Sequence, residues 1–97
     1  MKAQRIFYDK AVLADGAIVE MTIWRLPEAS SERPHGPKYS LFFGRDGKRL
    51  VGYDNERGKG DHKHLGDLET PYRFVNVEQL VADFLADVER ANGEHHG

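Results

Sequence analysis

A change of hydrophobic period near residue 75 restricts what this chain can fold into. From Val77 onward, six apolar side chains recur at i, i+3, i+4, i+7, i+8 and i+11, which predicts an amphipathic helix over about residues 77–91. Asn76 is a good N-cap, and Asn92-Gly93 supplies a stop. Because such a stripe gains most of its stability from burial, the helix must pack on another element. The stripe comprises Val77, Leu80, Val81, Phe84, Leu85 and Val88, and Glu78, Asp83, Asp87 and Arg90 are expected to point away from it.

The residues before the helix follow the two-residue period of β-strands instead. Asp15-Gly16 and Asp46-Gly47 are each flanked by runs rich in β-branched and aromatic residues, which is typical of a tight β-hairpin. The sequence therefore predicts an α+β domain: a four-stranded antiparallel sheet, made of two hairpins, with the C-terminal helix packed on one face. Strands are expected over about residues 5–13, 18–26, 39–43 and 49–53.

Length and composition fit one domain without disulfides or a membrane span. A chain of 97 residues with 39% hydrophobic content can bury one modest core, so residues 1–97 are assigned to a single domain. The absence of cysteine excludes disulfides and thiolate metal sites. The opening run MKAQRIFYDK lacks the apolar stretch of a signal peptide, and no window approaches the roughly 20 apolar residues of a membrane helix. We therefore expect a cytoplasmic protein with no membrane partner.

Charge is distributed unevenly along the chain. The net charge of −2 does not suggest a dedicated nucleic-acid binder. Residues 45–66, however, hold six basic and four acidic side chains, whereas residues 67–97 hold two basic and seven acidic ones. An anionic ligand is therefore expected to bind the middle segment. That segment contains most of a predicted polar loop over residues 54–71, and a second, proline-rich loop is expected over residues 27–38.

The run GKGDHKH, residues 58–64, concentrates glycines, cations and histidines within the predicted polar loop. Glycine lets backbone N–H groups approach a ligand closely, and basic side chains suit phosphate oxygens. We therefore predict an anion-binding cradle, with a solvated turn of mixed charge as the plain alternative. No GxxxxGK[ST] pattern supports a nucleotide P-loop. The cradle would comprise Arg57, Gly58, Lys59, Gly60 and Lys63.

His62 and His64 are the candidate catalytic residues. If their segment is extended, the i, i+2 spacing places both imidazoles on one side, where one accepts a proton and the other donates it. Asp61 or Asp54 would orient a histidine, and the arrangement suits cleavage of RNA by its own 2′-hydroxyl without a metal cofactor. In a second hypothesis both histidines bind a divalent metal with Asp61 or Asp54, although His-x-His alone is a weak signal. In a third, they are exposed side chains that contact water or backbone.

Trp24 lies opposite the predicted core face of its strand, which carries Val19, Met21 and Ile23. An outward tryptophan can stack on a nucleobase or be covered by another protein surface. Since a core of this size leaves the second sheet face open, we expect a second copy to cover Trp24, and thus a homodimer.

Three runs of this sequence resemble small bacterial proteins of the TumE family of toxin–antitoxin systems. They are DGAIVEMTIW, GKRLVGYDNERGKGDHKHLG and TPYRFVNVEQLVADFLADVE, and the resemblance covers roughly residues 8 to 90. Its most distinctive part is YDN, followed by GKGDHKH and then by PY-F with a helix. The resemblance implies a toxin that a cognate antitoxin protein neutralises. Combined with the histidine pair, it leads to the hypothesis of a toxin that is an RNA endonuclease. A toxin or interaction module that only binds a protein is the alternative, and a His/Asp metal-binding protein is the second.

Overall fold

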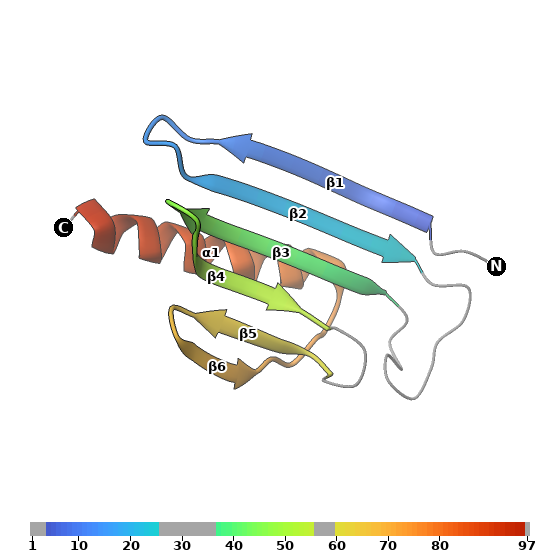
Figure 1. Ribbon diagram of the computed structural model, residues 1–97. Helices are drawn as coiled ribbons and strands as arrows, with labels where there is room; N and C mark the ends of the chain where they lie inside the picture. The colour runs from blue at the N-terminus through green and yellow to red at the C-terminus, as the bar shows by residue number, and fades with distance from the viewer. Residues whose placement is uncertain (1–3, 26–36, 56–59, 97) are drawn as a thin grey trace.

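The computed structural model describes residues 4–25, 37–55 and 60–96, and in these residues six strands form a single antiparallel sheet (Figure 1). The strand order is β1-β2-β3-β4-β5-β6, so each strand pairs with its neighbour in sequence. The helix α1 lies behind the sheet and packs on β4 (Figure 1). The elements are β1 (Gln4–Val12), β2 (Ile18–Arg25), β3 (Lys38–Arg45), β4 (Lys48–Asp54), β5 (His62–Leu65), β6 (Leu68–Pro71) and α1 (Val77–His96).

Both predicted hairpins are present, each with its turn at an Asp-Gly dipeptide. Between β1 and β2, Gly16 has a φ of 88°, and the Ala17 N–H donates to Asp15 Oδ1 at 3.0 Å. Between β3 and β4, Asp46 and Gly47 have φ values of 56° and 76°, the two positive values of a type I′ turn. The α+β class is confirmed, and β3 and β4 extend beyond their predicted bounds at both ends.

The predicted four-stranded sheet is wrong, because residues 62–71 of the expected polar loop form a third hairpin. Lys63 and Leu65 face α1 and alternate with His62 and His64, which lie on the other face of the sheet. The residues of β5 therefore follow the two-residue period of a strand, although most of them are polar. Gly66 starts the turn between β5 and β6 with a φ of 61°. A Gly-Asp dipeptide is a hairpin signal in its own right. The earlier predicted loop, residues 27–38, lies mostly outside the described residues, and Lys38 already belongs to β3.

The helix begins where the sequence predicted, since the Gln79 N–H donates to the Asn76 side chain at 2.7 Å. It continues past the expected stop to His96. Neither Asn92 nor Gly93 has the positive φ of a helix stop, and the Asn92 side-chain oxygen accepts from Arg45 Nη2 at 2.9 Å, which ties this turn to the end of β3. One glycine inside a helix costs only about 1 kcal/mol. No helix among the described residues is long and apolar enough to cross a membrane.

The core lies between α1 and the face of the sheet that it covers. Two helix positions depart from the prediction: Leu85 is 42% exposed, whereas Asp87 is 6% exposed. Asp87 follows Phe84 by three positions, so it shares the buried face. Its carboxylate accepts from Tyr53 Oη and from Arg90 Nη1, and it lies 3.4 Å from Lys63 Nζ. The buried apolar residues are Ala17, Met21, Ile23, Tyr39, Leu41, Phe43, Val51, Tyr53, Leu80, Phe84 and Val88.

Candidate functional site

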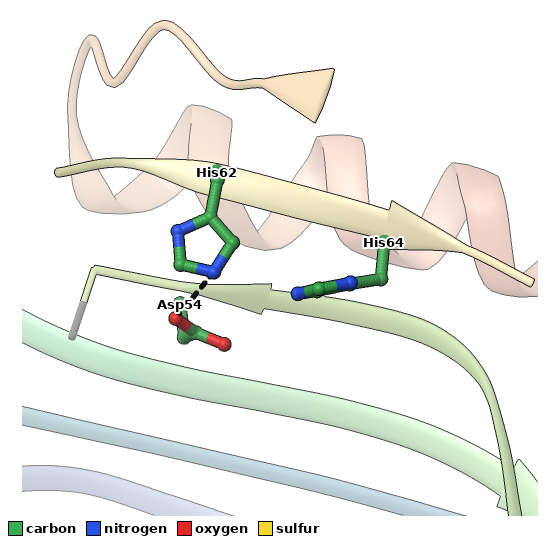
Figure 2. A group of neighbouring side chains, drawn as sticks. All are labelled: Asp54, His62 and His64. Carbon is green, nitrogen blue, oxygen red and sulfur yellow. Dashed lines mark ion pairs between the residues drawn. The ribbon is translucent and has the colours of Figure 1, made fainter. Parts of the chain in front are cut away.

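The pairing of β4 with β5 brings Asp54 opposite His62 on the face of the sheet that α1 does not cover, called here the outer face (Figure 2). His64 follows on the same face and pairs with Gly52. The two imidazole rings meet edge to face, with centroids 5.1 Å apart. The sequence prediction that extended backbone would place both rings on one side describes this geometry correctly. We call Asp54, His62 and His64 the outer triad.

His62 is held at both ring nitrogens. Its Nε2 lies 2.9 Å from Asp54 Oδ1, and its Nδ1 lies 3.1 Å from the Gly60 carbonyl oxygen. The His62 side chain is 8% exposed and that of Asp54 is 25% exposed. Because both nitrogens face oxygen acceptors, a neutral ring can donate to only one of them. A metal ion bound to Nε2 and Asp54 would leave the Nδ1–H to donate to the Gly60 carbonyl group.

His64 is in a different electrostatic environment. Burial lowers the pKa of His64, the nearby positive charge of Arg49 lowers it further, and Glu69 opposes the shift. The Glu69 carboxylate lies 3.1 Å from His64 Nε2, but its side chain is 54% exposed. The neutral form of His64 is thus favoured, which suits a proton acceptor or a metal ligand.

Arg49 is a cation of the site that sequence reasoning missed. A register shift between Phe43 and Gly44 pairs Gly44 with Arg49, which leaves Leu50 as an extra residue in β4. The bulge turns Arg49 to the outer face. There its side chain lies over Gly52, where an added Cβ would be 2.7 Å from Arg49 Cδ. The bulge leaves no clear mark in the sequence, although a glycine within a strand is a weak hint of a close approach.

Of the other predicted site residues that the structure describes, Asp61 and Lys63 do not join the outer triad, whereas Gly60 contacts His62. Asp61 accepts a hydrogen bond from Tyr39 Oη at 2.5 Å, and it does not belong to the outer triad. Lys63 faces α1, where its Nζ lies 5.6 Å from the centre of the Tyr53 ring as well as near Asp87. Gly60 has a φ of 70° and contributes the carbonyl group that orients His62. Arg57, Gly58 and Lys59 lie outside the described residues.

The outer triad has the donor set of a metal site. One ligand atom from each of Asp54, His62 and His64 lies within 4.8 Å of the others, which makes this a candidate metal-binding group among residues 4–25, 37–55 and 60–96. A backbone carbonyl that accepts from the second nitrogen of a ligating histidine, as Gly60 is placed to do, is common at such sites. Asp54, and not Asp61, would be the carboxylate ligand.

The family model described as Toxin TumE matches residues 2–92, which include every strand and most of α1. A search of the curated proteins and a search of the solved structures found no match.

Proposed function

Because the chain belongs to the TumE toxin family, we propose that it is the toxin of a toxin–antitoxin pair and that it acts as an RNA endonuclease without a metal cofactor. Membership implies a cognate antitoxin protein as partner. The nuclease activity is our proposal from the geometry of the site. It is supported above all by the contact of two histidines in different environments, beside a carboxylate and an arginine on the outer face.

The two histidines have complementary roles in the proposed cleavage. His64, whose neutral form is favoured, accepts the proton of the RNA 2′-hydroxyl as that oxygen attacks the phosphorus atom. The bond from phosphorus to the 5′-oxygen breaks, and His62, which Asp54 and the Gly60 carbonyl group orient, gives a proton to that oxygen. Arg49 holds the phosphate and stabilises the extra negative charge of the transition state. The products are a 2′,3′-cyclic phosphate and a 5′-hydroxyl end.

A metal-binding function is the second candidate, because ligand atoms of three suitable side chains lie within 4.8 Å of one another on the outer face. In that case Asp54, His62 and His64 would hold a divalent ion. A chain that binds such an ion is expected to carry about one equivalent of metal after purification. Its melting temperature would fall on treatment with a chelator.

A cleavage assay distinguishes the candidates. Labelled RNA is incubated with wild type, His62→Ala and Lys63→Ala, each with and without EDTA. Lys63 is the matched control because it is the neighbouring residue on β5 and faces α1. We expect wild type and Lys63→Ala to cut in both conditions, and His62→Ala to be slower by about 10²–10⁴-fold.

Other outcomes identify the alternatives. Cleavage that EDTA abolishes would assign the outer triad to a metal ion. RNA left intact by wild type, in a preparation that is toxic in cells, would indicate a toxin that acts by binding a protein.

A further inference from the structure

A recess of about 290 Å³ lies next to the outer triad. It is lined by Trp24, Lys38, Tyr39, Ser40 and Asp54. Asp54 is also the partner of His62, so the recess and the triad share a wall. We call it the Trp24 recess.

The sheet register aligns the Trp24 recess with the histidines. Ser40 pairs with Asp54 and Asp54 pairs with His62, so these three residues form a row across neighbouring strands. Trp24 pairs with Lys38 in the adjoining row. With neighbouring strands about 4.8 Å apart, the Cα atoms of Ser40 and His62 are about 10 Å apart. A ligand of this length can contact the Trp24 recess and the histidines at the same time.

The lining of the Trp24 recess combines an aromatic ring with a lysine cation. Lys38 Nζ lies 5.1 Å from the centre of the Trp24 ring, on the sheet face that α1 leaves open. Single-stranded nucleic acids bind to surfaces of this kind, because bases stack on aromatic rings while basic side chains contact the phosphates. The flexible lysine stem lets the ammonium group leave the ring for a phosphate when a base stacks there.

We propose that the Trp24 recess binds a nucleobase of single-stranded RNA next to the phosphate held at the histidines, with Trp24 as stacking platform and Lys38 as phosphate contact. The choice of RNA as the polymer rests on the proposed function. A second copy of this chain suits the recess less well, because the buried centre of a dimer interface is depleted of charged residues, whereas Lys38 and Asp54 line this recess.

Trp24 is the only tryptophan of the chain, so its fluorescence reports directly on the recess. The probe is a short single-stranded oligonucleotide of 2′-O-methyl RNA, which has no 2′-hydroxyl to act as nucleophile. We expect saturable quenching of Trp24 emission. In fluorescence anisotropy with a labelled probe, Trp24→Ala should bind about tenfold more weakly than wild type, and Trp24→Phe should recover part of the loss. Phe7→Ala is the matched control. Phe7 is an exposed aromatic residue, and because it pairs with the core residue Ile23 it lies on the other face of the sheet from Trp24.

The outcomes separate this proposal from the nuclease proposal. Quenching together with weaker binding by Trp24→Ala supports the subsite even if wild type leaves RNA intact. Cleavage of RNA by wild type, with unchanged Trp24 emission at saturating probe and equal affinity for Trp24→Ala, would overturn the subsite and leave the nuclease standing. A wild-type dimer in light scattering that Trp24→Ala converts to monomer, without any effect of the probe, would also overturn it, because a second copy would then cover the recess.

Discussion

The two faces of the sheet both carry buried polar side chains, but these side chains have different kinds of partner. On the face that α1 covers, Tyr53 and Lys63 meet Asp87 of the helix, so the contacts join sheet to helix. On the outer face, the triad residues contact one another, the Gly60 backbone and the exposed Glu69. Tyr53 and Asp54 are adjacent in the chain, as are His62 and Lys63, so strand alternation alone assigns neighbours to different faces. The comparison predicts that covered-face changes alter stability and outer-face changes alter activity.

The largest expected effect is on the covered face. Phe84→Ala should lower the free energy of unfolding by about 3–5 kcal/mol, since it removes a fully buried ring from the centre of the helix–sheet interface. Urea denaturation measures the change. Leu85→Ala is the matched control: its side chain is 42% exposed, and a surface substitution changes stability by about 0.5 kcal/mol or less. Equal losses for the two variants would mean that α1 does not pack as described.

The next prediction compares Arg49 and Lys63, two cations near the histidines. Arg49 lies on the outer face of the sheet and Lys63 on the covered face. Arg49→Ala should slow RNA cleavage by about 10²–10³-fold, because it removes the positive charge next to the scissile phosphate. Its stability should change by about 0.5 kcal/mol or less, as the residue is exposed. Lys63→Ala should do the reverse: it removes a cation from buried Asp87, at a cost of about 1 kcal/mol, with the cleavage rate per folded molecule unchanged. Parallel urea titrations and single-turnover assays measure both quantities.

The sequence predicted the parts of this arrangement that depend on local pattern. The two Asp-Gly hairpins, the N-cap at Asn76 and the shared side of His62 and His64 follow from turn chemistry and side-chain period, and the structure has all of them. The β5–β6 hairpin was not predicted, because the polar side chains on its outer face made these residues resemble a loop. The two-residue period of its covered face was therefore not recognised.

Features that depend on contacts between residues distant in the chain could not be predicted from the sequence. Asp87 is buried because Tyr53 and Lys63, both distant in the chain, satisfy its carboxylate. Arg49 joins the histidines because of a bulge whose register only the paired strands define. Asp54, and not Asp61, contacts His62 because β4 and β5 pair in that register. Each depends on which residues of different elements come together, and the local patterns of one sequence do not reveal that.

A smaller effect on stability is expected from removing a tyrosine hydroxyl. Two tyrosines, Tyr53 and Tyr8, each donate a hydrogen bond to a carboxylate. Tyr53→Phe should lower the free energy of unfolding by about 1–3 kcal/mol, because buried Asp87 loses a donor that water cannot replace. Tyr8→Phe removes the hydrogen bond to Glu20 of 2.8 Å at the exposed edge of the sheet, and should change stability by about 0.5 kcal/mol or less. Urea denaturation at pH 7 tests the pair. A larger loss for Tyr8→Phe would contradict the contrast between a buried and an exposed hydrogen bond.

The smallest expected effect is on the pH dependence of stability, and it again depends on the covered face. Burial, followed by the hydrogen bond to Asp87, raises the pKa of Tyr53 well above its usual value of about 10. In the unfolded chain this hydroxyl ionises near pH 10, whereas in the folded chain it stays protonated to higher pH. Its contribution to stability is therefore complete below pH 10 and is lost as the pH rises above it, by up to about 1.4 kcal/mol per pH unit.

Tyr53→Phe should remove this contribution. Urea titrations between pH 9 and pH 11 should give a shallower loss of stability for Tyr53→Phe than for wild type, although the variant is less stable at pH 7. Lysines titrate in the same range but are common to both proteins, so the difference between the two slopes isolates Tyr53. Equal slopes would show that the hydroxyl is not shielded by α1 in solution. The helix–sheet contact at Asp87 would then be looser than the structure indicates, and the contrast between the two faces would be weaker.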